Sequence, residues 1–250
     1  MAATSPSQRA LAERVLRVLD LTSLGEQDTP QRIETLCASA RTAHGDAAAV
    51  CVYPEHVTTA RRCLGAGGVR IATVVNFPDG GEDALRVERE ARRAIAAGAD
   101  EIDMVLPYRA LLRGDAVQAA EVVRRCRTAC GAGIVLKLIV ESGELASERA
   151  LRAACAIGID AGVDFLKTST GKARVNATPQ AAAIMLDAIR LAAAGCGFKV
   201  AGGVRTLEDA RAYVDQAAAL FGAEWIEPRH FRIGASALMD EIGRVLADGA

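Results

Sequence analysis

Four lysines are the residues of this chain whose types and positions point most directly to chemistry. Only Lys137, Lys167, Lys172 and Lys199 are lysines among 30 basic residues, and the other 26 are arginines. A lysine can lose its proton and form an imine with an aldehyde, whereas an arginine does neither. All four lie in or just after apolar, strand-like runs. We therefore expect lysine to persist where amine chemistry is needed.

Lys167 is the strongest candidate for a nucleophile. It lies in the stretch Asp164–Lys172 (DFLKTSTGK), directly after the apolar residues Phe165 and Leu166. Apolar surroundings strip water from an ammonium group, disfavour its charged form and free the amine to attack. The sequence therefore predicts a buried, nucleophilic Lys167, followed by small hydroxylic residues, a glycine and a second lysine, Lys172.

Apolar runs alternate regularly with helical patterns along the chain. The runs predicted as strands are Leu19–Leu24, Ala47–Pro54, Val69–Pro78, Asp100–Pro107, Gly133–Ser142, Asp164–Ser169, Phe198–Val204 and Phe231–Ser236. Each is followed by a predicted helix. Such alternation is typical of a parallel sheet, and eight units in 250 residues predict an α/β fold, a closed (β/α)8 TIM barrel. An open, doubly wound sheet is the alternative, and the lack of a glycine fingerprint opening an early helix disfavours it.

The domain organisation is expected to be simple. Residues 1–250 form one predicted barrel domain, with a disordered start over Met1–Pro6 and no linker. Active sites of such barrels lie at the carboxyl ends of the strands. We therefore look for the functional groups at the ends of neighbouring strands.

Three inward charges are predicted to meet at that end of the barrel. Strand four carries Asp103, and the neighbouring strands six and seven carry Lys167 and Lys199. Two converging ammonium groups repel each other, so the pKa of at least one should fall, and Asp103 can transfer protons. A plain buried salt bridge between Asp103 and Lys199 is the alternative. Lys137, on strand five, either tunes the electric field of the site or only positions Asp103.

A phosphate site is predicted beside these charges. Barrels often hold phosphate on small-residue loops after strands seven and eight, with backbone N–H groups and a helix N-terminus. The predicted substrate contacts are Thr22, Cys51, Thr170, Gly171, Lys172, Gly202, Gly203, Arg205, Gly234 and Ser236. For Cys51, a packed core thiol is the equal alternative.

Composition excludes several classes of partner. A formal net charge of -1 and a pI near 6.3 argue against nucleic acid or an anionic membrane surface. No apolar stretch approaches a membrane span, and no secretion signal opens the chain, so we expect a cytoplasmic protein. The seven cysteines and three histidines offer no complete set of metal ligands, so we expect reduced cysteines, no metal and no cofactor.

Eight segments of the sequence closely resemble one enzyme family. They are DLTSL, VCVYP, TVVNFP, EIDMVLPY, LKLIVESGEL, FLKTSTGK, FKVAGGVRT and FRIGAS, in this order over nearly the whole chain. The family they resemble is deoxyribose-phosphate aldolase. The resemblance implies a metal-free class I aldolase on a (β/α)8 barrel, with Lys167 as the Schiff-base lysine and Asp103 and Lys199 as proton-transfer residues. It also implies sugar-phosphate and aldehyde substrates and a homodimer.

The chain departs from the family pattern in three places. Val200 stands where some members have proline, and Ala237 where many have a second serine. The tail ADGA has no aromatic residue, so a terminal tyrosine cannot assist proton transfer. These departures bear on rate and phosphate affinity. Two other readings stay open: a class I aldolase or transaldolase for another sugar phosphate, and a non-catalytic phosphate-binding barrel.

Overall fold

A closed barrel of parallel strands forms the centre of the molecule. The structure is a computed structural model that describes residues 6–145 and 147–247. In chain order, the barrel strands of this described part are β1 (Leu19–Thr22), β4 (Ala49–Val52), β5 (Arg70–Val75), β6 (Glu101–Val105), β7 (Val135–Ile139), β8 (Phe165–Lys167), β9 (Gly197–Ala201) and β10 (Phe231–Ala235). Each pairs with its neighbours in parallel, and β1 closes the ring between β10 and β4. The predicted (β/α)8 TIM barrel is therefore confirmed.

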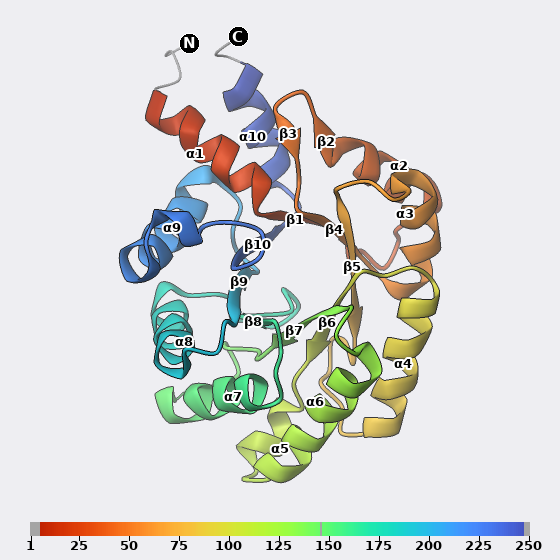
Figure 1. The fold of residues 1–250 in the computed structure, drawn as a ribbon, viewed down its shortest axis with the longest axis vertical. Coiled ribbons are helices and arrows are strands. Elements are labelled where there is room, and N and C mark those ends of the chain that lie inside the picture. The colour runs from red at the N-terminus through yellow and green to blue at the C-terminus, as the bar shows by residue number, and fades with distance from the viewer. Residues whose placement is uncertain (1–5, 146, 248–250) are drawn as a thin grey trace.

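Helices surround the ring of strands (Figure 1). They are α1 (Pro6–Arg17), α2 (Pro30–Ser39), α3 (Val57–Leu64), α4 (Ala84–Ala96), α5 (Tyr108–Leu112), α6 (Ala116–Cys130), α7 (Glu148–Asp160), α8 (Pro179–Ala192), α9 (Leu207–Phe221) and α10 (Leu238–Ala247). Every barrel strand is followed by at least one of them. The first and last helices, α1 and α10, pack against each other, and Arg9 donates a hydrogen bond to the Leu246 carbonyl.

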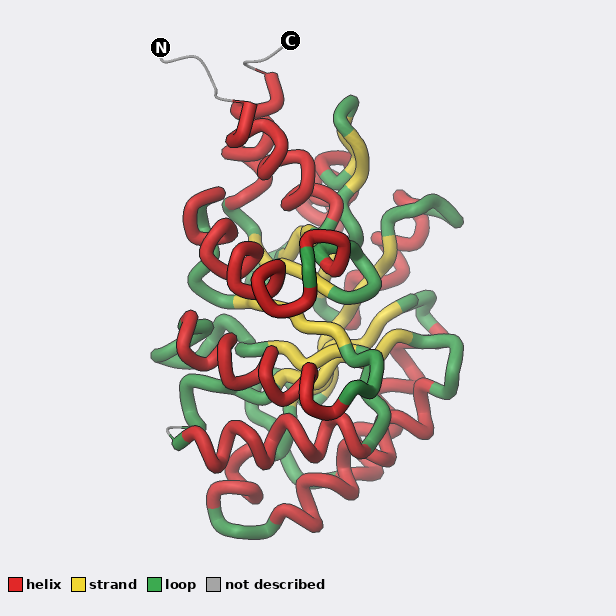
Figure 2. Tube along the Cα trace, turned by 60° about the vertical axis from the view of Figure 1, so that its left-hand side comes forward, coloured by secondary structure: helices red, strands yellow, loops and turns green. Residues whose placement is uncertain are grey.

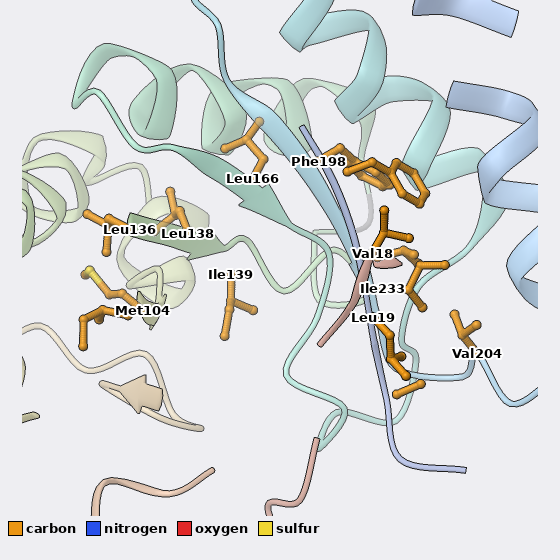
Figure 3. Close-up of a cluster of buried hydrophobic side chains, with 14 of the residues drawn as sticks. Val18, Leu19, Met104, Leu136, Leu138, Ile139, Leu166, Phe198, Val204 and Ile233 are labelled. Atoms are coloured by element: carbon orange, nitrogen blue, oxygen red, sulfur yellow. The ribbon is translucent and has the colours of Figure 1, made fainter. Parts of the chain in front are cut away.

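The strands sort their side chains by alternation. Successive residues point to opposite faces of a strand, so one set faces the helices and the other faces the barrel axis. The helix-facing set is apolar, and Figure 3 shows members of it, including Met104, Leu138, Leu166 and Ile233. The axis-facing set is divided. Small apolar residues from β4 and β5 fill one side (Ala49, Cys51, Ala72, Val74). The other strands contribute a cluster of buried charged residues together with apolar ones such as Phe165, whose ring lies against Arg232.

Several elements differ from the predicted ranges. Most strands are shorter than their apolar runs, since the ladder ends before the run does: β7 covers Val135–Ile139 rather than Gly133–Ser142. Gly234 lies within β10 and not in the loop after it. The prediction also missed the short helix α5 and the hairpin of β2 (Arg41–Thr42) and β3 (Gly45–Asp46), which projects from the barrel (Figures 1 and 2).

The described part of the chain begins with a helix, and its cysteines are not paired. Pro6, assigned to a disordered start, begins α1, while residues 1–5 and 248–250 lie outside the described residues. All seven cysteines are free thiols, as predicted. Within residues 6–145 and 147–247, no helix is both long enough and apolar enough to cross a membrane.

Candidate active site

Lys167 and Lys199 lie side by side inside the barrel. Lys167 is the last residue of β8 and pairs in register with Lys199 on β9. Both side chains point toward the barrel axis and are almost completely buried. The structure therefore brings the amines of Lys167 and Lys199 together on neighbouring strands, as predicted.

Asp103 joins the two amines. Its Oδ2 accepts a hydrogen bond from Lys167 Nζ at 2.8 Å and a second from Lys199 Nζ at 2.8 Å. Asp103 lies on β6, and none of its surface is exposed to solvent. The three residues singled out for chemistry thus form one hydrogen-bonded group. Such a group can hold an amine, a carboxylate and an ammonium within reach of a single substrate carbon.

Their surroundings shift the pKa values of the two lysines in opposite directions. Burial lowers the pKa of Lys167, Asp103 opposes that fall, and Lys199 adds to it, so the net pKa lies below the ordinary value. Burial also acts to lower the pKa of Lys199, but Asp103 and Asp20 outweigh it and the pKa is raised. Lys167 is therefore the amine more easily made neutral, while Lys199 remains an ammonium.

Asp103 is held as a carboxylate. Burial alone would raise its pKa, but Lys137, Lys167 and Lys199 together keep it well below the usual range. A carboxylate of this kind accepts a proton only from a neighbour whose own acidity is rising during a reaction. The Asp103–Lys199 pair is therefore arranged as a carboxylate beside an ammonium, the two forms that a proton relay needs at the start.

Lys137 is wholly buried and contacts three carboxylates. Its Nζ lies 2.8 Å from Asp103 Oδ1, 2.5 Å from Glu101 Oε2 and 3.3 Å from Asp20 Oδ2. Burial would lower its pKa, yet these carboxylates raise it well above the ordinary value. Lys137 is therefore a fixed cation. Both roles left open by the sequence are compatible with this geometry, because it orients Asp103 and also sets the local field.

Three members of the buried charge group were missed in the sequence. Asp20 of β1 contacts Lys199 Nζ at 2.5 Å and Arg232 of β10 at 2.6 Å. Glu101 of β6 contacts Arg232 at 2.9 Å. A signal for them exists, since each is a charged residue with apolar neighbours on both sides or an inward partner two residues away. Their partners, however, lie on strands distant in the chain.

An open cavity of about 420 Å³ adjoins Lys167 at the carboxyl end of the strands. It is lined by ten of the predicted residues: Thr22, Lys167, Thr170, Gly171, Lys172, Gly202, Gly203, Arg205, Gly234 and Ser236. The lining is completed by residues that were not among the predicted contacts: Ser23, Leu24, Gly25, Arg32, Ala201, Val204, Ala235 and Ala237. The cavity therefore brings the candidate nucleophile and the candidate phosphate loops to one space.

Three cationic side chains line the cavity in addition to Lys167. Lys172, Arg205 and Arg32 all line it and all are exposed. Lys172 Nζ donates to the Leu24 carbonyl at 2.8 Å, which ties two of the lining loops together. The helix α10 begins at Leu238, directly after the lining residues Ser236 and Ala237, so its N-terminus adjoins the cavity. Cations and helix N-termini together favour a bound anion.

Two glycines are required by close approach. Gly202 has φ of 84°, and a Cβ there would lie 2.7 Å from Asn176 Oδ1. A Cβ on Gly234 would lie 3.1 Å from the Lys199 Cε atom. Gly202 therefore shapes the phosphate loop, whereas Gly234 makes room for the buried lysine. The second role was not expected for a residue predicted to lie in a loop.

Cys51, Asp103 and Lys199 do not line the cavity. Cys51 is fully buried on β4 among Ala49, Ala72 and Val74, and burial raises the pKa of its thiol. That position fits the packed core thiol, the alternative weighed for it. Asp103 and Lys199 lie directly behind the Lys167 amine, where they reach it through hydrogen bonds.

Glu141 is a further buried carboxylate at the edge of the site. It follows β7, adopts a left-handed φ of 56°, and accepts hydrogen bonds from the Thr170 amide at 3.3 and 3.4 Å. Burial raises the pKa of its carboxyl, and Thr170 opposes that rise. Glu141 therefore anchors the loop between Lys167 and Lys172. Nothing in the sequence pattern indicated this contact.

The inward carboxylates do not form a metal centre. Among the described residues, no group of three or more His, Cys, Asp or Glu side chains is arranged to hold a metal ion. Asp20, Glu101 and Asp103 are each bound to lysine or arginine instead.

The chain matches a family model and several solved structures. The model of the DeoC/LacD family aldolases matches residues 14–241. A protein from Coccidioides immitis, provisionally named a deoxyribose-phosphate aldolase, is 30% identical with a TM-score of 0.82, over 96% of this chain and 88% of that one. A tetrameric deoxyribose phosphate aldolase from Aeropyrum pernix is 24% identical with a TM-score of 0.73, over 98% and 93%. The second likeness concerns the fold alone.

A third structure agrees in fold at lower identity. It comes from Toxoplasma gondii ME49, has the same provisional name as the Coccidioides protein, and superposes with a TM-score of 0.89 at 22% identity, over 97% of this chain and 98% of that one. The family model covers residues 14–241 of the 250 in this chain, and the closed barrel superposes on these structures. This chain belongs to the DeoC/LacD family of aldolases and is therefore a lyase.

Proposed function

We propose that this protein reversibly cleaves 2-deoxy-D-ribose 5-phosphate to D-glyceraldehyde 3-phosphate and acetaldehyde through a Schiff base on Lys167. The observation that carries the proposal is the position of Lys167. It is the one buried lysine of the described chain that lines the cavity, and its pKa is lowered. A reaction of this class serves deoxyribonucleoside catabolism.

The first step in the cleavage direction is imine formation. The neutral amine of Lys167 attacks the C1 aldehyde of the open-chain sugar, and loss of water gives an iminium. The iminium then accepts the electron pair of the C2–C3 bond as that bond breaks. A neutral amine is available for the attack because Lys167 has only one carboxylate contact, and Asp103 shares that contact with two other lysines.

Proton transfer accompanies the break of the C2–C3 bond. The C3 hydroxyl loses its proton toward Asp103, directly or through a water molecule, and glyceraldehyde 3-phosphate leaves. The Lys199 ammonium, 2.8 Å from the same Asp103 oxygen, supplies the balancing charge and a proton for the return. The remaining enamine is protonated at C2, and hydrolysis of the imine releases acetaldehyde. A positioned acid–base pair is worth roughly 10²–10⁴-fold in rate.

The phosphate binds away from the reacting bond. The proposed phosphate contacts all line the same cavity as Lys167: Lys172, Arg205, Gly202, Gly203, Gly234 and Ser236. Binding energy from a remote phosphate holds the aldehyde carbon near Lys167, which raises the rate by orientation. The proposed reaction uses neither metal nor cofactor, because the iminium is the electron sink.

The test is a cleavage assay with purified protein. Acetaldehyde and glyceraldehyde 3-phosphate should form in equal amounts from 2-deoxyribose 5-phosphate, and incubation with a chelator should leave the rate unchanged. A panel of other phosphorylated sugars, each with and without an aldose acceptor, addresses the alternative of another class I aldolase or a transaldolase. Turnover of another panel member at a much higher kcat/KM would replace the proposed substrate.

The oligomeric state is a separate expectation. The resemblance to the deoxyribose-phosphate aldolases favours a homodimer, while the Aeropyrum pernix relative is a tetramer. Light scattering after gel filtration distinguishes the two.

A further inference from the structure

The buried charges form a continuous chain along the barrel axis. Lys167 lines the cavity at the carboxyl end of the strands, and Asp103 connects it to Lys137. Lys137 contacts Glu101 at 2.5 Å, and Glu101 contacts Arg232 at 2.9 Å. Every link in this chain is 2.9 Å or shorter. The candidate nucleophile is therefore coupled electrostatically to the buried pair Glu101 and Arg232.

Glu101 and Arg232 end this chain at the opposite mouth of the barrel. Both line a second cavity of about 600 Å³, together with residues from the amino-terminal ends of the strands, such as Arg70 and Ala48. Neither residue lines the cavity that contains Lys167. A substrate bound at Lys167 would therefore not touch Glu101 or Arg232, and any influence they have on it is indirect.

The charges along the axis do not balance when all of them are ionised. Lys137, Lys167, Lys199 and Arg232 are four cations, whereas Asp20, Glu101 and Asp103 are three anions. Lys199 and Arg232 each contact two carboxylates and Lys137 contacts three, but Lys167 contacts only Asp103. A buried excess charge is costly. The group closest to neutrality is the one with the fewest carboxylate contacts, Lys167.

The groups that face Lys167 come from several strands. Asp103 of β6 and Lys199 of β9 are its nearest charges, and Cys51 of β4 and Glu141 after β7 also act on it. Lys137 and Asp20 lie behind Asp103 and Lys199. Glu101 and Arg232 do not contact Lys167, so they act on it at a distance, through their charges and through the groups that they hold in place.

We propose that Glu101 and Arg232 are positioning residues that act on Lys167 through Asp103 and Lys137, and that their combined charge decides how readily Lys167 presents a neutral amine. This inference rests on the proposed role of Lys167 as the nucleophile. Glu101 and Arg232 together carry no net charge. Loss of Glu101 makes the buried charge group more positive by one unit, and loss of Arg232 makes it more negative by one unit. The amino-terminal mouth of the barrel thereby sets the operating pH of the site at the other mouth.

The proposal predicts shifts of opposite sign for two single variants. Glu101→Gln removes a negative charge, makes the axis more positive and favours the neutral amine, so the acidic limb of kcat/KM against pH moves to lower pH. Arg232→Gln removes a positive charge and moves that limb to higher pH. Each shift should be roughly 0.6–1.2 pH units, as expected for a unit charge about 10–20 Å away at an effective dielectric constant of about 20.

The double variant and a charge-preserving variant separate charge from shape. Glu101→Gln combined with Arg232→Gln removes one charge of each sign, so the limb should return to within about 0.2 pH unit of the wild type. Arg232→Lys keeps the charge and should leave the limb near its wild-type position even if kcat falls. All variants are assayed with the same substrate, so the titration of its phosphate is common to every profile.

Arg70→Gln is the matched control. Arg70 lines the same cavity at the amino-terminal mouth but is exposed, and no hydrogen bond or ion pair of its side chain is among the contacts of the described residues. Solvent screens such a charge, so this variant should keep the wild-type profile.

A charge can also be added without breaking any contact. Ala48 is half-buried on the wall of the same cavity. Ala48→Glu should move the acidic limb to higher pH relative to Ala48→Gln, with a smaller shift than Arg232→Gln because the new carboxylate is partly solvated. This pair decides the matter if a variant of the ion network does not fold.

Failure of the inference is distinguishable from failure of the proposed function. Substrate and borohydride are added at pH 9, and the modified residue is located by mass spectrometry. If the wild type forms no adduct on Lys167, the proposed function fails. If the adduct forms, but the two single variants leave the acidic limb in place or shift it in the same direction, the positioning role of Glu101 and Arg232 is overturned.

Discussion

Lys167 and Lys199 show how one residue type takes opposite forms a short distance apart. Both are buried and both contact Asp103, yet the pKa of Lys167 is lowered and that of Lys199 is raised. The difference lies in Asp20, which contacts Lys199 at 2.5 Å. A single additional carboxylate thus assigns the nucleophile to one strand and the ammonium to the next.

The first prediction at this scale concerns Lys199→Leu. Loss of the ammonium removes the partner of Asp103 in proton transfer, so kcat should fall roughly 10²–10⁴-fold. It also removes a cation that lowers the pKa of Lys167, so the acidic limb of the remaining activity should move to higher pH. Imine formation should persist at pH 9, measured as borohydride-dependent mass increase. A variant with unchanged kcat would exclude Lys199 from the relay.

The second prediction concerns Lys172→Met. Lys172 is exposed and lines the cavity, and its loss removes a charged hydrogen-bond donor for phosphate. KM for 2-deoxyribose 5-phosphate should rise roughly 10–100-fold, in line with hydrogen bonds to charged groups. Cleavage of unphosphorylated 2-deoxyribose should be unchanged, as should the KM of an Arg174→Met control from the same loop, outside the cavity. If Lys172→Met reduced kcat/KM equally for the phosphorylated and the unphosphorylated sugar, a contact between Lys172 and the phosphate would be contradicted.

The loops that carry the site are fixed by the ends of the elements that flank them. Thr206 accepts a hydrogen bond from the Asp209 amide at 3.1 Å, and Asp209 Oδ2 accepts from the amides of Arg205 and Thr206, both at 2.9 Å. This capping box starts α9 and fixes the backbone directly after Gly202 and Gly203. The cavity wall is therefore stabilised by a helix cap.

Thr206→Ala tests that contribution. Loss of an N-cap side chain should lower the free energy of unfolding by about 1 kcal/mol. Urea unfolding followed by circular dichroism measures it, with Thr206→Ser as the variant that keeps the hydroxyl and should keep the stability. If Thr206→Ser lowers the free energy of unfolding as much as Thr206→Ala does, the hydroxyl of the N-cap is not the source of the stability.

Local patterns explain why much of the barrel and its lysines could be predicted. Apolar runs alternating with helical patterns predicted all barrel strands. Lys167 was found because it directly follows the apolar residues Phe165 and Leu166, and Asp103 because it is a charged residue within the predicted strand Asp100–Pro107. Strand ends were less accurate, because apolar residues continue beyond the last ladder hydrogen bond. The helix α5 is too short for a periodic pattern.

The rest of the charge network could not be read from local pattern. Arg232 and Glu101 are 131 positions apart in the chain, and Lys199 and Asp20 are 179 apart. Only closure of the ring, with β1 beside β10, brings them together. A charged residue between apolar ones, such as Arg232 in FRIGAS, is a local signal of an inward charge. Its partners cannot be predicted locally, because they depend on which strands lie opposite across the barrel axis.

At the scale of the whole molecule, the ion network makes stability depend on pH. Burial alone would raise the pKa values of Asp20 and Asp103. Lys137, Lys199 and Arg232 lower that of Asp20, and Lys137, Lys167 and Lys199 lower that of Asp103. A carboxyl whose folded pKa is depressed stabilises the fold above its unfolded pKa, about 3.9, and this contribution is lost as pH falls below it.

The free energy of unfolding should therefore be steady from pH 7 to about pH 5 and fall steeply from about pH 4 to pH 3. Urea titrations at these pH values measure it. The exposed Glu148→Gln should follow the wild-type curve, and Asp103→Asn should be less stable at pH 7 but should depend less on acid. A wild-type curve that is flat down to pH 3 would contradict the charged state assigned to these carboxylates.

The central claim is that Lys167 forms the Schiff base, and trapping tests it most directly. Protein is incubated with 2-deoxyribose 5-phosphate and borohydride, digested, and the adduct located by mass spectrometry, with Lys167→Leu and Lys172→Met in parallel. We predict an adduct on Lys167 in the wild type and in Lys172→Met, and none in Lys167→Leu. An adduct on Lys137, Lys172 or Lys199, or no adduct in the wild type, would contradict the account.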